Sequence, residues 1–488
     1  MRTEFERISP AKAGIDPAAI EWLLDRLEEG DGEPHGLMIM RHGKICAEGW
    51  WAPYAPGIRH GQQSHSKTYT ATAIGIAYTE GILSLEERLV DIFPDRIPEH
   101  PSENLKKLRV RDVLCMGCGM DEMPVDSEEW VRDFLAIPVN HEPGTAFMYN
   151  TAGSTVLGAI IREKTGLGLQ EYLKPRLYDK IGIVSDNHRW LRMSDGIEAG
   201  GGGLFCTTED NLRLMKLYAD GGVWDGERIL AEDYVRQAVG HQIDSVTQNL
   251  LAKDNFLGYG FQIWMCAPKG AYRADGAMGQ FTIVIPDKDM IIAINENASG
   301  GGGPQRTLDL LWQFLDRIHE DVIPEDPDAD TRLKNRLARL SLPRARYMPV
   351  SPLTEKINGR KYSLKEGLLP FDPYGFGRQY VNTLTICEMG EFSLDFECDR
   401  MILAGGDTRI VFAMDGSRRY NEIGDGLIRQ ALCSAYFAEE DELVLLVRWI
   451  ETCNEQKFQF HFCDREIQIK VRGTMMGAEK TLYFTAQS

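Results

Sequence analysis

The sequence predicts a multidomain α+β protein, in which an antiparallel sheet flanked by helices, with an inserted helical subdomain, precedes a separate all-β domain. Three observations support this class. Strand-like patterns lie near the start and the end of residues 1–322, helical patterns lie between them, and short apolar runs recur in residues 353–488. We place a linker at 323–352. The 488 residues, 43% of them hydrophobic, suffice for more than one core.

The first predicted elements are a helix and a hairpin. Residues 16–30 carry apolar side chains at helical spacing, with Asp16 as the N-cap and Pro17 in the first turn. Residues 36–51 contain two apolar runs on either side of His42-Gly43, which predicts a β-hairpin.

The rest of this domain is predicted to be helical at first and then stranded. We expect helices at 68–77, 152–165, 207–221 and 304–319, and strands at 256–266, 271–275, 280–285 and 290–294. Thr207 or Thr208 caps the third of these helices, whose first turn is acidic. Because the early hairpin and the late strands can pair in one sheet, the helical middle becomes an inserted layer.

The linker and the last domain have a different composition. Prolines and acidic residues mark 324–328, and a short basic helix is expected at 331–340. Runs at 443–450, 458–462 and 467–471 are typical of antiparallel strands. They predict a barrel or a sandwich.

Charge argues against two classes of partner. The chain has 73 acidic and 54 basic residues, so neither nucleic acid nor an anionic membrane is an expected partner. The N-terminus lacks the apolar core of a signal peptide and no run of about 18 apolar residues occurs, which favours the cytoplasm. The sequence leaves the oligomeric state open.

The ten cysteines do not predict a metal site. Cys115 and Cys118 have the spacing of redox and zinc sites, but no second pair or histidine cluster completes four ligands. We expect reduced, partly buried thiols, no metal ion and no cofactor.

The segment with the clearest chemical meaning is Ser64-His65-Ser66-Lys67, at the start of a predicted helix. Ser64 and Lys67 are three residues apart and therefore share a helix face. A hydroxyl beside an amine suits a nucleophile and its proton acceptor, provided that burial and the helix dipole lower the lysine pKa. On its own, the pattern is more often a helix cap beside a solvated side chain.

Other motifs are weaker. The segment before Lys67 fails as a phosphate loop, because Ser66 stands where a glycine is required. No Gly-x-Ser-x-Gly nucleophile elbow occurs. Residues 200–203 are four glycines that could bind an anion, but a tight loop is the favoured interpretation.

Four segments, in order along residues 1 to about 320, resemble the serine β-lactamase and penicillin-binding-protein superfamily, specifically its esterase and class C-like branch. They are residues 64–67 for the Ser-x-x-Lys motif, 143–151 for the segment with the catalytic tyrosine, 200–208 for the glycine-rich entry to a late helix, and 273–280 for the Lys-Thr-Gly or His-x-Gly strand. The β domain resembles the barrel-like appendage of some members.

The resemblance implies a site and a reaction. Ser64 would be the nucleophile, Lys67 its proton acceptor, and Tyr149 an assistant, as a phenolate or as a proton relay to the leaving group. The backbone N–H groups of Ser64 and Ala277 would form an oxyanion hole. Asp275 and Gly276 would line the substrate site.

Two departures from the family pattern bear on the expected activity. Thr151 replaces the asparagine of Tyr-x-Asn, with Asn150 one place early, and Ala274 replaces the lysine or histidine of the third motif. The resemblance implies that this cation helps to hold the carboxylate of a penicillin. We therefore expect cleavage of a small ester or amide through an acyl-enzyme on Ser64, rather than efficient β-lactam hydrolysis.

Several alternatives stay open. Transfer of the acyl group to an alcohol or amine competes with hydrolysis, and no acidic residue stands out as a deacylation base. The weakened second and third motifs also fit a catalytically silent binding or sensor protein that keeps a β-lactamase-like fold.

Overall fold

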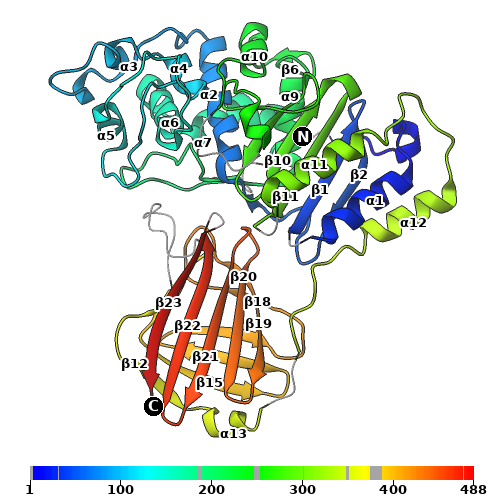
Figure 1. Cartoon of the computed structure of the whole chain (residues 1–488), viewed down its shortest axis with the longest axis vertical. Coiled ribbons are helices and arrows are strands. Elements are labelled where there is room, and N and C mark those ends of the chain that lie inside the picture. The colour runs from blue at the N-terminus through cyan, green and yellow to red at the C-terminus, as the bar shows by residue number, and fades with distance from the viewer. Residues whose placement is uncertain are drawn as a thin grey trace. The chain divides into compact units, whose positions relative to one another are not determined.

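The computed structural model describes residues 4–30, 32–184, 188–246, 253–299, 302–347, 351–373, 387–475 and 478–488. The chain divides into two compact units, residues 1–341 and 342–488, as Figure 1 shows.

Within the range 323–352, which the sequence indicated as a linker, residues 348–350 lie outside the described part. The helix α12 (Pro327–Leu337) lies in the same range and belongs to the first unit. It packs against α1 (Pro17–Glu28).

The first unit is built on a six-stranded antiparallel sheet in the order β2-β1-β11-β10-β9-β8. The predicted hairpin is β1 and β2, and its turn residues His42 and Gly43 both have positive φ, as a type I′ hairpin turn requires. β1 pairs with β11, so strands from the start and the end of the unit share one sheet. The strands are β1 (Glu33–Arg41), β2 (Lys44–Trp50), β8 (Trp264–Met265), β9 (Tyr272–Gly276), β10 (Gln280–Ile285) and β11 (Met290–Asn297).

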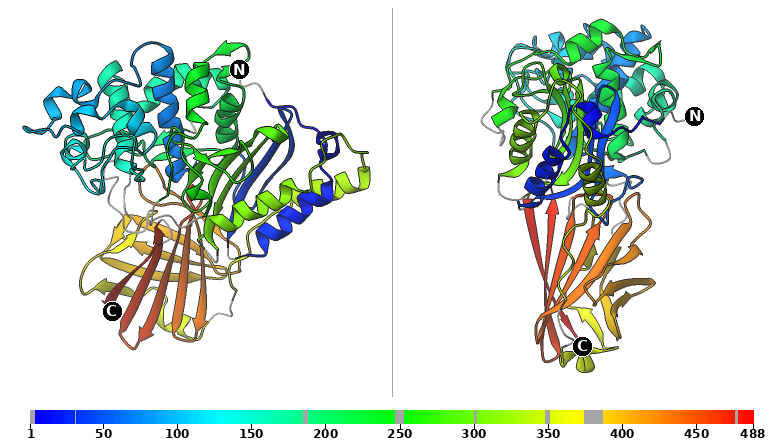
Figure 2. Two further views of the ribbon diagram at one scale, coloured as in Figure 1. Left: turned by 45° about the horizontal axis from the view of Figure 1, so that its top comes forward. Right: turned by 90° about the vertical axis from the view of Figure 1, so that its right-hand side faces the viewer.

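Helices cover both faces of this sheet, which is why β1, β10 and β11 are buried along nearly their whole length. α9 (Thr208–Ala219) packs against these three strands, and α1 packs beside α11 (Gly303–Leu315) on the other side (Figures 1 and 2). The predicted caps are present: Asp16 Oδ1 accepts from Ala18 N, and Thr207 forms a capping box with Asp210.

The inserted layer surrounds α2 (Ser66–Thr79), which is buried from Ser66 to Ala77 and packs against α6 (Thr151–Thr165). Gly75 leaves room for the ring of Tyr234, which a Cβ would overlap. The other helices are α3 (Leu89–Ile92), α4 (Val110–Leu114), α5 (Trp130–Ala136), α7 (Leu169–Leu173), α8 (Asp179–Ile181) and α10 (Glu232–Ala238). Short strands are β3 (His60–Gly61), β4 (Arg189–Trp190), β5 (Leu204–Cys206), β6 (Val223–Trp224) and β7 (Glu227–Arg228).

The strand predicted over 256–266 is mostly absent. Residues 253–256 form a 3₁₀ turn, and only β8 at the end of the range is a strand. Gly258 and Gln262 have φ values of 108° and 57°, which an extended strand does not accommodate. The apolar spacing in this range therefore reflects burial of a folded loop.

The second unit is a barrel whose strands pair antiparallel except where it closes, so of the two predicted architectures the barrel is confirmed. Nine strands of the described residues follow in the order β17-β16-β15-β12-β23-β22-β21-β20-β19, and a contact between Ala413 and Ser434 joins β17 to β19. β18 lies beyond β19. The strands are β12 (Lys361–Leu364), β15 (Glu391–Glu397), β16 (Arg400–Gly405), β17 (Thr408–Ala413), β18 (Arg419–Glu422), β19 (Gln430–Glu439), β20 (Glu442–Trp449), β21 (Glu455–Cys463), β22 (Glu466–Met475) and β23 (Ala478–Gln487). The unit also holds the pair β13 (Leu369–Phe371) and β14 (Cys387–Met389), and α13 (Leu353–Ile357).

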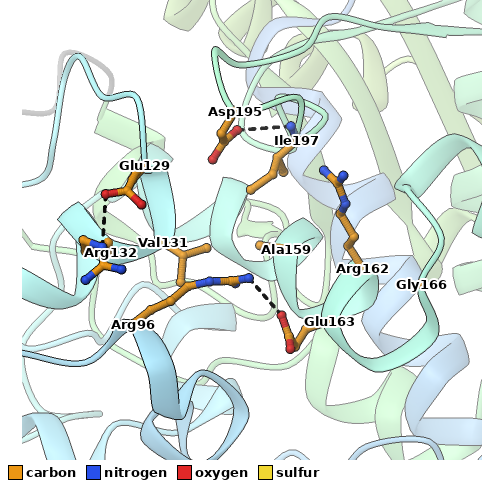
Figure 3. Close-up of a pocket in the computed structure, with 10 residues that line it drawn as sticks. All are labelled: Arg96, Glu129, Val131, Arg132, Ala159, Arg162, Glu163, Gly166, Asp195 and Ile197. Carbon is orange, nitrogen blue, oxygen red and sulfur yellow. Dashed lines mark hydrogen bonds and ion pairs between the residues drawn. The ribbon is translucent and has the colours of Figure 1, made fainter.

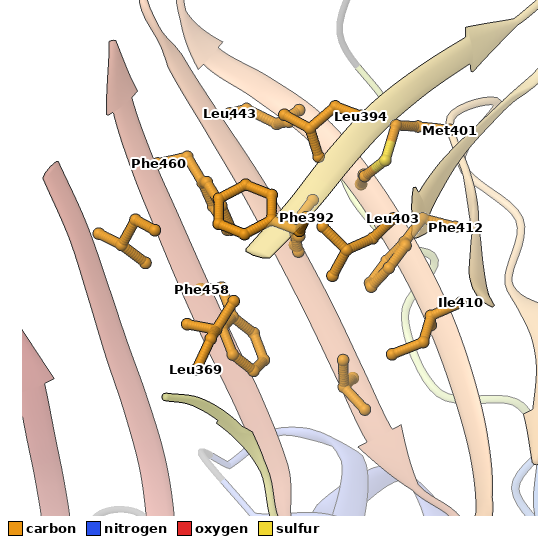
Figure 4. Close-up of a cluster of buried hydrophobic side chains, with 14 of the residues drawn as sticks. Leu369, Phe392, Leu394, Met401, Leu403, Ile410, Phe412, Leu443, Phe458 and Phe460 are labelled. Atoms are coloured by element: carbon orange, nitrogen blue, oxygen red, sulfur yellow. The ribbon is translucent and has the colours of Figure 1, made fainter. Parts of the chain in front are cut away.

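Side chains fill the barrel. Figure 4 shows phenylalanine, leucine and methionine side chains from several strands in mutual contact, among them Phe392, Leu403 and Phe460. Trp449 is also part of this core, and its indole N–H donates to Gln456 Oε1 at 3.3 Å. Among the described residues of the whole chain, no helix combines the length and apolar character needed to cross a membrane.

Candidate active site

Ser64 lies in a tight 3₁₀ turn (Gln63–His65) that leads directly into α2, which begins at Ser66. Gln63, just before it, has a φ of 49°, in the left-handed region that non-glycine residues rarely occupy. The turn is held from both sides: Ser66 Oγ donates to Gln63 O at 2.6 Å, and His65 Nε2 is 3.0 Å from Thr282 Oγ1 on β10. The hydroxyl of Ser64 is therefore presented by a fixed, strained turn.

Lys67 reaches back to this hydroxyl. Its Nζ lies 2.9 Å from Ser64 Oγ and 2.5 Å from Gly201 O, and only 1% of the residue is exposed. Burial lowers the Lys67 pKa to about 7, against the opposing charge of Asp275. Near neutral pH a large share of this amine is therefore uncharged and able to accept a proton.

The carbonyl of Gly201 is a partner that the sequence did not reveal. Residues 200–203 were interpreted as a tight loop, and the loop also supplies the second acceptor for Lys67. A Cβ on Gly201 would lie 2.5 Å from Thr151 O, so glycine lets the loop pack against the start of α6. Thr151 stands where the family pattern has asparagine, and here a backbone oxygen holds the amine.

Tyr149 lies beside the same two residues. Burial raises its pKa well above the usual value, although a hydrogen bond to the Ser64 hydroxyl opposes this. Lys67 Nζ is 4.8 Å from the centre of the Tyr149 ring. Of the two roles considered for Tyr149, the raised pKa favours a neutral phenol that relays a proton over a phenolate.

Met116 and Met120 contact the segment that carries Tyr149. Asn150 N donates to Met116 Sδ at 3.1 Å, and Met148 N donates to Met116 O at 3.0 Å. The side chain of Asn150 does not enter the site: its Oδ1 caps α6 at Gly153 N, 2.8 Å away, and its Nδ2 is 3.7 Å from Met120 Sδ. Asn150 is thus a helix cap rather than a displaced active-site amide.

The end of β9 closes the other side of the site. Gly276 packs so tightly against the carbonyl of Gln62 that a Cβ would overlap it, and this brings the following residue, Ala277, next to the Ser64 turn. Gln280 Nε2 donates to Ala277 O at 3.2 Å. The predicted oxyanion pair, the N–H groups of Ser64 and Ala277, thus lies on two segments in contact.

The charged residues of β9 are not those of the family pattern. Ala274 is fully buried and carries no charge. Arg273 is also fully buried, with donors directed to Asp275 Oδ2 at 2.8 Å, Met265 O at 2.9 Å and Asn255 Oδ1 at 2.5 Å. Asp275 is thus the charged side chain of this strand that retains exposure, 17%.

The aromatic neighbours of Tyr149 were also missed: Tyr259 and Trp264 come from the range predicted as a strand, and Phe147 from the segment that carries Tyr149 itself. Trp264 stacks on the Tyr149 ring with centroids 5.5 Å apart, and Tyr259 meets Trp264 edge to face at 4.6 Å. Phe147 lies 5.9 Å from Trp264. The spacing of these residues in the sequence holds no signal for this cluster.

Two other features do not include Ser64. Cys115 and Cys118 are buried free thiols, and the described residues contain no group of three or more ligands that could hold a metal ion.

A cavity of about 460 Å³ lies against α5 and α6. It is lined by the pairs Arg96–Glu163 and Arg132–Glu129 together with Asp195 and Arg162 (Figure 3).

Comparison with known proteins gives one consistent result. The sequence model of the Beta-lactamase family matches residues 24–315. A 6-aminohexanoate-dimer hydrolase of Paenarthrobacter ureafaciens is 25% identical over 299 residues, 55% of this chain and 74% of that protein. A penicillin-binding protein 4 of Amycolatopsis lactamdurans is 24% identical over 311 residues, 55% of this chain and 80% of that protein. A penicillin-binding protein homologue from Caulobacter crescentus has a similar fold, with a TM-score of 0.50 and 14% identity over 64% of this chain and 100% of that one.

Proposed function

The chain belongs to the beta-lactamase family of serine hydrolases, and on this premise we propose that it is an esterase or amidase that forms an acyl-enzyme on Ser64. One observation carries the proposal. The amine of Lys67 is buried, lies 2.9 Å from Ser64 Oγ, and has its pKa lowered to about 7. A serine activated by an adjacent base is the arrangement that covalent acyl transfer requires.

The first half of the reaction builds the acyl-enzyme. As Ser64 Oγ bonds to the substrate carbonyl carbon, neutral Lys67 takes the hydroxyl proton. The oxygen of the carbonyl becomes an anion, which the N–H groups of Ser64 and Ala277 stabilise, and one such donor contributes about 3–4 kcal/mol. The bond to the leaving group then breaks, and the phenol of Tyr149 delivers a proton to it and recovers one from Lys67.

The second half reverses these roles. A water molecule attacks the ester carbonyl, and neutral Lys67 takes its proton, either directly or through the phenol of Tyr149, which passes its own proton on to Lys67; Ser64 Oγ then leaves with that proton returned to it. The substrate is a small-molecule ester or amide. A penicillin-type carboxylate lacks its usual partner, because Ala274 is uncharged and the donors of Arg273 are directed into the protein.

A fluorophosphonate probe tests the nucleophile. We expect a single phosphonylated adduct by intact mass, located by peptide fragmentation on Ser64 and not on the neighbouring Ser66. Ser64→Ala abolishes the adduct and the turnover of p-nitrophenyl acetate, whereas Ser417→Ala, at an exposed serine of the second unit, retains both. An unlabelled wild-type protein, or an adduct that survives Ser64→Ala, would contradict the proposal and favour the binding or sensor alternative.

A further inference from the structure

Asp275 places a carboxylate beside the proposed nucleophile. It lies on β9, two residues before Ala277, and it interacts electrostatically with both Lys67 and Tyr149. Burial raises the pKa of Asp275, and the charges of Arg273 and Lys67 oppose that shift. This strand holds a cation in the family pattern, so the sign of the local charge is reversed here.

The buried guanidinium of Arg273 does not cancel this reversal. The Arg273 side chain has no exposed surface, whereas that of Asp275 retains 17%, so of this ion pair only the carboxyl side chain is accessible to a small molecule. Asp254, 1% exposed, adds a second negative charge that acts on Asp275. With Lys67 uncharged, the interacting charges are two carboxylates, Asp275 and Asp254, and the one guanidinium of Arg273.

Aromatic faces border the same carboxylate. Tyr149 and Trp264 stack on one another, and Phe147, which is half-buried, lies at their edge. Nitrogen groups of the protein already lie against these rings: Lys67 Nζ is 4.8 Å from the centre of the Tyr149 ring, and the guanidinium carbon of Arg273 is 5.8 Å from that of Trp264. Aromatic faces combined with a carboxylate form the chemistry that recognises ammonium groups.

From these contacts we propose that Asp275, with the Tyr149–Trp264 ring pair, selects substrates that carry an ammonium group close to the scissile ester or amide bond. The inference rests on the proposed function, since it concerns the same site. It concerns substrate choice only: the charge of Asp275 lowers the free energy of a bound cation and raises that of a bound carboxylate. The ammonium is on the acyl side or on the leaving-group side, and the test includes both.

Matched substrate pairs that differ only in charge test this selection. On the acyl side the pair is the methyl ester of β-alanine and methyl butyrate; on the leaving-group side it is acetylcholine and its uncharged carbon isostere. For each pair, kcat/KM is measured by pH-stat for the wild type, Asp275→Asn and Asp287→Asn. Asp287 is an exposed carboxyl in the turn at the far end of β10, and serves as the matched control.

We expect the charged member of at least one pair to be preferred by about tenfold or more. Asp275→Asn lowers that preference by a similar factor, and Asp287→Asn leaves it in place. A preference for the uncharged member in both pairs, or a preference that Asp275→Asn does not change, would overturn the inference. Failure of the proposed function is a separate result, because no ester, charged or uncharged, would then be cleaved faster than by Ser64→Ala.

Discussion

At the scale of single residues, the protonation of Lys67 governs the proposed chemistry. The amine loses its charge near pH 7 because it is buried, and only the neutral form accepts the Ser64 proton. Ser64 Oγ and Gly201 O both lie within hydrogen-bond distance of the amine and hold it in place whether it is charged or neutral. The pH dependence of the rate therefore reports directly on this group.

We predict that kcat/KM for an uncharged ester rises as the pH increases and levels off above an apparent pKa of about 7. Lys67→Ala lowers kcat by about 10²–10⁴-fold, because general-base assistance is lost. The measurement is a pH–rate profile between pH 5 and about 9. A profile that is flat across this range would rule out Lys67 as the proton acceptor.

At the scale of elements, the strand β11 holds a carboxyl in an unusual position. Glu296 is buried against Gly279, in the turn that follows Ala277, and its Oε1 has no hydrogen-bond partner among the described residues. Burial raises its pKa to about 8, opposed by a hydrogen bond from Thr307 and the charge of Arg306. β11 thus carries an acid that stays neutral in the folded protein over most of the physiological range.

This shift predicts how stability depends on pH. Between about pH 4.5 and 8 the unfolded chain releases the Glu296 proton while the folded protein retains it, so stability falls as the pH rises. The slope from this group is at most about 1.4 kcal/mol per pH unit. Urea unfolding of the wild type and of Glu296→Gln across this range isolates the effect. A difference in unfolding free energy that stays constant with pH would contradict the assignment.

Local sequence patterns predicted most of the helices and strands, but they predicted less well where these elements begin and end. Turn and cap chemistry located α1, the β1–β2 hairpin and α9, because Asp16, His42-Gly43 and Thr207 act on their immediate neighbours. The helix predicted over 68–77 extends from Ser66 to Thr79, and Ser64 lies just before it in a 3₁₀ turn. The strand predicted over 256–266 was wrong, since a buried loop shows the same apolar spacing as a buried strand.

At the scale of the whole molecule, the two units have separate cores. The sheet of the first unit needs strands from both ends of residues 1–341, whereas the barrel strands, as far as the described residues go, pair with one another and not with strands of the first unit. The interior of the barrel is filled by its own side chains (Figure 4). The second unit therefore contains the contacts that a domain needs in order to fold alone.

We predict that a fragment of residues 342–488 folds independently. Its far-UV circular dichroism is that of a β protein, and urea unfolds it in one cooperative transition. The matched control is the same fragment with Phe460→Ala, which removes a fully buried core ring and costs about 3–5 kcal/mol. A fragment that shows no cooperative transition would indicate that its core depends on the first unit.

By itself, the sequence determined the fold class, the barrel-or-sandwich domain and the Ser64–Lys67 pair, because helical spacing, turn chemistry and ordered motifs depend on residues close together in the chain. Only the tertiary structure decided what surrounds that pair. Gly201 O meets an amine 134 residues earlier, and β9 and Trp264 bring Asp275 and an aromatic face to Tyr149. The burial that lowers the Lys67 pKa arises from these distant segments packing together, and no local pattern contains it.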